Sequence, residues 1–271
     1  MSLLFLGTKA LRFFFLTFSF CFFTCFASIP KISIITSLYK GEKFIEGFMQ
    51  DIVRQTAFDE CELIIINANS PENEERFIQP YLEKFPNIFY FRLEEDPGLY
   101  GVWNIGIQMA SGEYITNANV DDRLAPNCYE VHMKLLDNQP KVDLVYSDYL
   151  WTEGANETFE KNSARVKRTQ RQFGVTALFF CAPGPNPMWR KSMHAKHGLF
   201  DETFRLAGDW EMWCRAAAGG SVFKKANGIY CLFYKNPDGL STSDDLWPEM
   251  AAERQRIIET YNHLFFKKGD G

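Results

Sequence analysis

The sequence lacks most of the short motifs that identify common enzymes and metal-binding proteins. Its seven cysteines form no Cys-x-x-Cys pair, which argues against a zinc site and against a disulfide framework. No Gly-x-Gly-x-x-Gly, Walker A or Gly-x-Ser-x-Gly motif is present, so the signatures of dinucleotide-binding enzymes, P-loop nucleotide hydrolases and α/β-hydrolases are missing. A net charge of -5 over 271 residues argues against a protein that coats nucleic acid, and we expect no nucleic-acid partner.

The N-terminal segment differs in composition from the rest of the chain. Residues 13–29 contain no charged residue, and nine of the 26 phenylalanines lie in the first 30 residues. A run of this length is at the short end of what spans a bilayer. We therefore expect residues 1–30 to form an apolar helix that attaches the protein to a membrane by a single span. A cleavable signal peptide is the alternative, because small residues Ala27 and Ser28 stand near a possible cleavage point.

From Lys31 onward, short apolar runs alternate with stretches of helical periodicity. This alternation predicts an α/β fold with a mainly parallel central sheet, and the absence of a Pro/Gly-rich linker predicts one domain over residues 31–271. Pro80 should kink or restart the helix predicted near residues 74–85. The predicted strands are 32–36, 62–67, 88–93, 114–119 and 142–151, and the predicted helices lie near 44–53, 74–85, 102–109 and 126–135.

The second half of the chain is less regular. The polar segment 152–173 is expected to be a mobile loop. After it, the pattern predicts a short helix at 209–218, a strand at 228–235 and a long amphipathic helix from Trp247 to Leu264.

Polar residues follow three of the predicted strands. In an open α/β sheet, ligands bind beyond the carboxyl ends of the strands. Asp121 and Asp122 stand together after the fourth strand, where a divalent cation such as Mg²⁺ or Mn²⁺ would relieve their mutual repulsion. The alternative from the residues alone is that Asp122 caps the next helix, or that both are solvated turn residues.

Four segments of the chain, in order, resemble the family 2 glycosyltransferases of the GT-A fold. They are ISIITSLYKGEKFIEGFMQDIVRQT, ELIIINANS, EDPGLYGVWNIGIQMASGEYITNANVDD and GLFDETFRLAGDWEMWCRAAAGG. Asn119 and Asp121 match the family's Asp-x-Asp element with Asn in the first position, which resembles a subgroup with Asn-x-Asp-Asp.

The resemblance implies a GT-A-type nucleotide-binding sandwich that transfers a sugar, with inversion, from a nucleotide-sugar donor to a hydroxyl acceptor. Asp209 matches the general base, and Asp121 matches the ligand of Mn²⁺ or Mg²⁺. Asn67 stands where the family usually has an Asp that reads the base, so the choice of base stays open. The donor-binding positions implied are Thr36, Tyr39, Glu42, Asn67, Asn69, Asp96, Asn104 and Asn119.

The acceptor side is implied more weakly. Met188 and Trp189 are expected to line the acceptor pocket, and Trp210 either stacks on a sugar or packs in the core. The expected acceptor is a glycan, a lipid-linked sugar or a protein. Two other functions are considered: a catalytically inactive relative that binds sugar or nucleotide, and a nucleotidyltransferase. The second would carry a Gly-rich, basic phosphate loop after the first strand, which residues 37–42 do not resemble.

Overall fold

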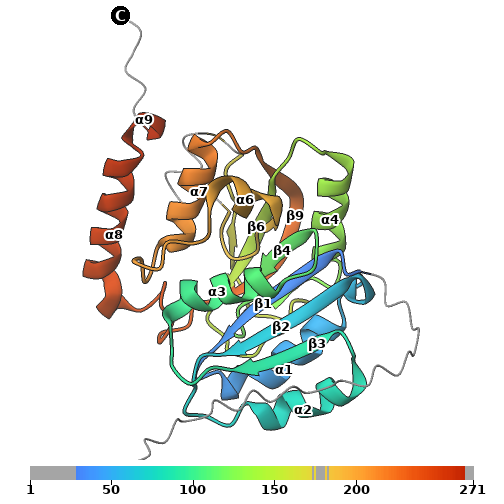
Figure 1. The fold of residues 1–271 in the computed structure, drawn as a ribbon. Helices are drawn as coiled ribbons and strands as arrows, with labels where there is room; N and C mark the ends of the chain where they lie inside the picture. Colours follow the sequence, from blue (N-terminus) through green and yellow to red (C-terminus); the bar gives the residue numbers. More distant parts are fainter. Residues whose placement is uncertain (1–28, 173, 175–180, 182, 266–271) are drawn as a thin grey trace, which may run out of the picture.

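The computed structural model of the chain describes residues 29–172, 174, 181 and 183–265 (Figure 1). A central sheet forms the middle layer, with the β1–β2 and β6–β9 pairs as its longest ladders. Across the sheet the strands are β3 (Ile88–Arg92), β2 (Cys61–Asn67), β1 (Ile32–Leu38), β4 (Tyr114–Asn117), β8 (Met188–Arg190), β6 (Leu144–Thr152), β9 (Phe223–Tyr234) and β5 (Arg123–Leu124), and β7 (Val166–Arg168) pairs with β6.

The strand directions divide the sheet into two parts. The strands β3, β2, β1 and β4 are all parallel. The short strand β8 lies between β4 and β6 and is antiparallel to both, so β6 and its parallel partner β9 again run in the direction of β1. The predicted α/β fold with a central sheet is confirmed. The sheet is mixed, however, because β8, β7 and β5, which were not predicted as strands, run antiparallel to their partners.

Helices cover both faces of the sheet. One apolar core joins α3, α6, α7 and α8 to one face, and a second core joins α1, α2 and α4 to the other. Figure 1 shows α8 beside α7, at the margin of the molecule. The helices are α1 (Glu42–Val53), α2 (Glu75–Lys84), α3 (Gly98–Met109), α4 (Cys128–Asn138), α6 (Ser192–His197), α7 (Gly208–Ala218), α8 (Trp247–Thr260) and α9 (Asn262–Phe265).

The two cores explain why the central strands are apolar without alternation. In β1, Ile34 packs into the core of α1 and its neighbour Ile35 packs into the core of α3. In β2, Ile65 packs into the core of α1 and Ile64 packs into the core of α3. Since successive side chains of a strand point to opposite faces, a strand buried on both faces needs apolar residues at every position.

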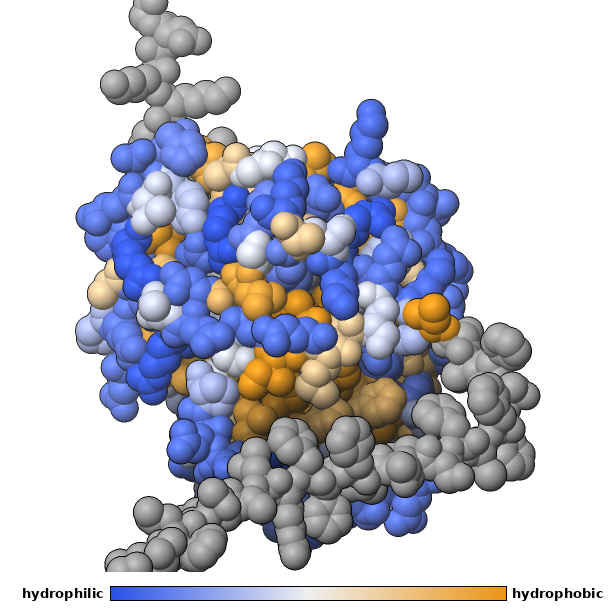
Figure 2. All heavy atoms as spheres, viewed as in Figure 1, coloured by the Kyte–Doolittle hydropathy of each residue, from blue (hydrophilic) through white to orange (hydrophobic). Residues whose placement is uncertain are grey.

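An apolar area remains on the face that Figure 2 shows, over α3 and the adjoining part of the sheet. Phe89 and Phe91 of the edge strand β3 and Met109 at the end of α3 are among the exposed large apolar residues. No other strand in the described part of the chain pairs with the outer edge of β3.

Three predicted local features differ in the structure. Pro80 lies inside the continuous helix α2. Proline has no N–H to donate to the Arg76 carbonyl, but Arg76 is exposed, so water can take the place of that donor. The expected loop 152–173 contains β7, where Lys167 pairs with Asp148 and the Arg168 guanidinium lies over the ring of Trp151.

The expected single C-terminal helix is two helices. α8 ends at Thr260, and Tyr261 then donates its hydroxyl to Glu211 of α7 at 2.5 Å. This contact draws the end of α8 toward the domain.

The predicted N-terminal anchor or signal peptide covers residues 1–30, of which 1–28 lie outside the described residues. Within the described ranges, no helix has the length and apolar character needed to cross a membrane.

The packing of α8 predicts that it is an integral part of the domain. Ile257 is fully buried in the core of α3 and α7. We expect Ile257→Ala to lower the free energy of unfolding by about 2–4 kcal/mol, because it removes buried methyl groups and leaves a cavity. Urea denaturation measures this, with Glu259→Ala on the exposed face of α8 as the control, expected within about 0.5 kcal/mol of wild type. Equal effects of the two variants would contradict the packing.

Candidate functional site

Three turns meet at the carboxyl edge of the parallel strands. Leu38 of β1 pairs with Asn67 of β2, and Ile35 pairs with Asn117 of β4. The backbone continues this register: the Ala68 N–H donates to the Leu38 carbonyl at 2.9 Å. The turns after β1, β2 and β4, which carry most of the predicted donor and metal residues, are therefore adjacent.

A buried hydrogen-bond network joins the turn after β1 to the turn after β2. The Ser70 hydroxyl accepts from the Lys40 N–H at 3.0 Å and donates to Glu74 Oε1 at 2.5 Å. The same carboxylate oxygen accepts from the Gly41 N–H at 3.0 Å. Lys40 and Asn69 both adopt positive φ, at 51° and 57°. The network holds these turns in a conformation that non-glycine residues seldom adopt.

The side chain of Asn67 is used to shape its own turn. It is fully buried, its oxygen accepts from the Ser70 N–H at 2.7 Å, and its nitrogen donates to the Tyr90 hydroxyl at 3.1 Å. Asn69 lies further out in the same turn, with the Arg92 guanidinium 3.4 Å from its oxygen. Of the two, Asn69 is the more accessible to a ligand.

The predicted residues of the first turn lie in three environments. Thr36 is fully buried, and its hydroxyl has no hydrogen-bond partner within the described ranges. Tyr39 is 46% exposed. Glu42 opens α1 and accepts hydrogen bonds from the Asn73 N–H at 3.0 Å and from Arg76. Tyr39 thus offers free surface at this edge.

Asp96 lies in the turn before α3 and Asn104 lies within α3, and both side chains are bonded to other residues of the chain. Asp96 is exposed and accepts from the Gly98 N–H at 2.8 Å, at the start of α3. Asn104 is buried, donates to Glu202 at 2.8 Å and to the Phe200 carbonyl, and accepts from the Phe200 N–H, both at 2.9 Å. Asn104 therefore ties α3 to the segment that leads into α7, and its contact with a donor remains a prediction.

The two adjacent aspartates after β4 differ in their surroundings. Asp122 is buried, accepts from the Tyr234 N–H at 3.0 Å and from the Asn119 amide at 3.1 Å. Burial, and next the negative charge of Asp121, raise the pKa of Asp122 well above its ordinary value. Asp121 is only partly buried, and one of its oxygens accepts from the Asn236 amide at 3.0 Å. Asp121 is thus the carboxylate that can reach a ligand.

Arg123 supports this turn, and its role could not be predicted because its partners are distant in the sequence. Its buried guanidinium donates to the carbonyls of Asp122 at 2.6 Å and Phe44 at 3.2 Å. A Cβ atom at Gly47 would lie 2.6 Å from the guanidinium, so the glycine makes room for it.

The oxygen ligands at this turn suit a hard cation whose coordination is completed by oxygens of the substrate. The described residues contain no cluster of three or more His, Cys, Asp or Glu that could hold a metal by themselves. Mg²⁺ is commonly held by one or two carboxylates together with phosphate oxygens and water. The accessible carboxylate of Asp121 fits that arrangement, whereas buried Asp122 is engaged by backbone and amide donors.

Asp209 lies at the start of α7 and contacts the start of α3. Its Oδ1 accepts from the Trp210 N–H at 2.8 Å and from the Tyr100 hydroxyl at 3.3 Å, and its Oδ2 lies 3.7 Å from the Cys181 sulfur. Burial raises the pKa of Asp209, and these donors oppose the effect. Because α3 begins just after β3, Tyr100 brings Asp209 to the carboxyl edge where the turns meet.

The three predicted acceptor residues are buried in the described structure. Met188 and Trp189 are in β8, where Met188 pairs with Thr116 and the Trp189 ring packs on Trp213 at 5.3 Å. Trp210 is 3% exposed, with the Arg254 guanidinium 5.1 Å from its ring. Met188 and Trp189 pack in the core because β8 lies in the middle of the sheet, and Trp210 packs in the core from α7.

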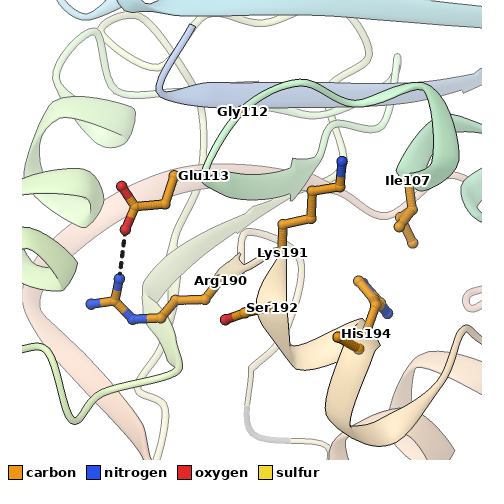
Figure 3. A pocket seen from close by; sticks show the side chains of 8 residues that line it. Ile107, Gly112, Glu113, Arg190, Lys191, Ser192 and His194 are labelled. Carbon is orange, nitrogen blue, oxygen red and sulfur yellow. Dashed lines mark hydrogen bonds and ion pairs between the residues drawn. The ribbon is translucent and has the colours of Figure 1, made fainter. Parts of the chain in front are cut away.

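A cavity of about 550 Å³ lies elsewhere, next to Gly112 and Glu113 at the amino end of β4 (Figure 3). Its cations are already engaged. Arg190 pairs with Glu113 and donates to the Leu136 carbonyl at the end of α4. Lys191 donates to the Ala110 carbonyl, where α3 ends. Arg190 and Lys191 thus cap the C-termini of α4 and α3. The candidate site lies at the opposite edge of the sheet.

Comparison with known proteins identifies the family. The model of Glycosyl transferase family 2 matches residues 33–198, which is more than half of the chain. The chain belongs to glycosyl transferase family 2. This confirms the predicted class of enzyme at the level of the family.

Relatives within the family are distant in sequence. An uncharacterized glycosyltransferase of Methanocaldococcus jannaschii is 25% identical over 198 residues, covering 72% of this chain and 67% of the relative. The Bacillus subtilis protein EpsH is 28% identical over 187 residues, covering 67% of this chain and 52% of the relative. The chain thus spans about half to two thirds of these relatives.

Solved structures share the fold. TarS 1-349 of S. aureus in complex with UDP-GlcNAc has a TM-score of 0.68 at 16% identity, covering 89% of this chain and 74% of that one. The mannosyltransferase PcManGT of Pyrobaculum calidifontis, in complex with GDP-Man and Mn²⁺, has a TM-score of 0.63 at 14% identity, covering 88% and 69%.

A second buried carboxyl, Asp51 of α1, lies beneath the aspartate turn. It accepts from the Leu124 N–H at 2.9 Å. With Asn117, Asn119 and Asp122 it lines a cavity of about 10 Å³, close to the space that one water molecule requires. Burial raises the pKa of Asp51 from 3.8 to about 6.

The raised pKa of Asp51 predicts a pH-dependent stability. The folded chain binds the proton of the Asp51 carboxyl more tightly than the unfolded chain does. The contribution of this proton to the free energy of unfolding is therefore fully present below about pH 4 and is lost as the pH rises through 6. Asp51→Asn keeps an acceptor for Leu124 and removes the titration. The difference in free energy of unfolding between the variant and wild type, measured by urea denaturation, should shift by about 2–3 kcal/mol in favour of the variant from pH 4 to pH 7. Exposed Asp59→Asn is the control, and the same gain there would refute the assignment.

Proposed function

We propose that the protein transfers a sugar from a nucleotide-sugar donor to a hydroxyl acceptor, with inversion and with the help of Mn²⁺ or Mg²⁺. The observation that carries the proposal is the position of Asp209. The Tyr100 contact brings this carboxylate to the same edge of the sheet as the three turns after β1, β2 and β4.

The donor is proposed to lie across the turns after β1 and β2. Solved relatives of the fold are complexes with UDP, UDP-GlcNAc and GDP-Man, which supports a nucleoside diphosphate sugar as the ligand class. Exposed Tyr39 and Asn69 offer contacts for the nucleoside at this edge. Since the buried Asn67 amide is uncharged and is already bonded to Ser70 of its own turn and to Tyr90 of β3, it does not favour one base.

Asp121 is proposed to hold the cation, with Asn119 and Asp122 shaping the turn behind it. When bound there, a divalent cation would act as a Lewis acid toward the diphosphate that departs. The Asn119 amide donates to Asp122, a contact that an Asp at position 119 could make only if one carboxyl were protonated. This gives the Asn-x-Asp-Asp pattern a structural reason.

Asp209 is proposed to be the general base. The acceptor hydroxyl must lose its proton as its oxygen attacks the anomeric carbon, and a carboxylate with a raised pKa is a stronger base than an exposed one. One base opposite the leaving diphosphate corresponds to a single displacement, which inverts the anomeric configuration.

The acceptor and the membrane contact rest on the sequence alone. We propose a glycan or lipid-linked acceptor, brought within reach because residues 13–29 attach the protein to a membrane.

The role of Asp209 is tested by nucleotide release from UDP-, GDP- and dTDP-sugars with Mn²⁺ present. Asp209→Asn is nearly isosteric and cannot take the proton, so release should fall at least about 100-fold. Exposed Asp59→Asn should match wild type. Full activity in Asp209→Asn would remove it as the base, and nucleotide binding without release by wild type would favour an inactive binding module.

The role of Asp121 is tested by titration with Mn²⁺, followed by electron paramagnetic resonance in the presence of UDP. Asp121→Asn should weaken Mn²⁺ binding at least about tenfold and lower donor turnover, because a neutral amide is a poorer ligand for a hard cation. Exposed Asp245→Asn serves as the control. Unchanged Mn²⁺ affinity in Asp121→Asn would contradict the assignment.

A further inference from the structure

The two oxygens of the Asp209 carboxylate have unequal partners. Oδ1 accepts two conventional hydrogen bonds, from the Trp210 N–H at 2.8 Å and the Tyr100 hydroxyl at 3.3 Å. Oδ2 has the Cys181 thiol at 3.7 Å. A thiol is a weak donor, so Oδ2 retains most of its capacity to accept a proton.

Tyr100 is held in place by its ring. It is 2% exposed, stacks on Phe200 at 5.8 Å and meets the edge of Trp103 at 5.4 Å. A Cβ atom at Gly208 would lie 2.7 Å from this ring, so the glycine before Asp209 allows the close approach. Because the ring is packed on these sides, the hydroxyl has a fixed position beside Oδ1.

Cys181 reaches Asp209 from an unusual backbone conformation. Its φ is 53°, in the left-handed region that non-glycine residues seldom adopt. Burial raises the pKa of the thiol, so it remains protonated and can donate. Because a thiol is a weak hydrogen-bond donor, a stronger donor can displace it from Asp209 Oδ2.

We propose that Tyr100 and Cys181 are positioning residues that assign different tasks to the two oxygens of Asp209. Tyr100, with the Trp210 N–H, anchors Oδ1 and fixes the plane of the carboxylate. Cys181 reserves Oδ2 for the acceptor hydroxyl, which displaces the thiol when it arrives. This inference rests on the proposed function, because it presupposes that Asp209 is the base.

Sugar transfer in this arrangement breaks two bonds and forms two. The acceptor O–H bond breaks and its proton passes to Oδ2, while the acceptor oxygen forms a bond to the anomeric carbon. The bond from that carbon to the diphosphate oxygen breaks, and its electron pair leaves with the nucleoside diphosphate. Tyr100 and Cys181 exchange no proton in this step.

Several ionisable groups surround Asp209 and bear on any pH profile. They are Tyr100 of α3, Cys181, Cys214 of α7 and Arg254 of α8. Tyr100 and Cys181 each lower the pKa of Asp209 by donating to its carboxylate. Removing the Tyr100 hydroxyl should therefore raise that pKa and move the acid limb of activity to higher pH.

The test compares Tyr100→Phe, Cys181→Ala and Cys181→Ser in nucleotide release from the donor that wild type uses, with water as acceptor, across pH 4–9. Tyr100→Phe keeps the packed ring and should lower the plateau rate about tenfold and shift the acid limb upward. Cys181→Ala should lower the plateau rate by less than Tyr100→Phe does, because a thiol is the weaker donor. Cys181→Ser should be slower than Cys181→Ala, because a hydroxyl donates more strongly and competes for Oδ2.

The outcomes separate this inference from the proposed function. A wild-type acid limb and plateau in Tyr100→Phe, or equal rates in Cys181→Ser and Cys181→Ala, would overturn the positioning roles while Asp209→Asn remains inactive. Full activity in Asp209→Asn would overturn the proposed base and this inference together. Thermal melting of each variant within about 3 °C of wild type shows that the fold is retained.

Discussion

The parallel register of β1, β2 and β4 is the constraint on which the site depends. It brings three turns that are far apart in the sequence to one edge of the sheet. The register is fixed because both faces of these strands are buried, and a slip by one residue would exchange the residues of the two cores. The side chains of the turns are then free to differ from the apolar pattern of the strands that position them.

Long-range contacts complete what the register begins. The Asp122 carboxylate accepts from Tyr234 at the end of β9, and Asn236 donates to Asp121. Asn104 of α3 binds the backbone of Phe200 and so guides the chain toward α7. These contacts join the first half of the chain, which carries the turns, to the second half, which supplies Asp209.

The sequence predicted the parts of this structure whose signal is local. The apolar runs of β1 and β2 and the periodicity of α1 mark elements that are buried on known faces, so their positions followed from pattern alone. Strand β8 was not recognised, because its three residues pair with β4 and β6 and carry no period of their own. Met188 and Trp189 of this strand were assigned to an acceptor pocket by resemblance to the family, and both are buried.

The candidate site shows the same division. Asp121 and Asp209 could be selected from motifs, whereas the supporting roles of Arg123, Glu74 and Tyr100 depend on partners that only the fold brings near. Glu74 contacts Gly41, and Tyr100 contacts a residue more than a hundred positions away. Hydrogen bonds of this kind leave no local spacing to detect.

The most direct test of the central claim is a crystal structure of the protein with Mn²⁺ and an intact donor sugar nucleotide. We expect Mn²⁺ bound by Asp121 and the diphosphate, with Asp209 Oδ2 facing the anomeric carbon from the side opposite the diphosphate. A donor bound away from the turns after β1, β2 and β4, or Asp209 separated from the sugar by other parts of the fold, would contradict it.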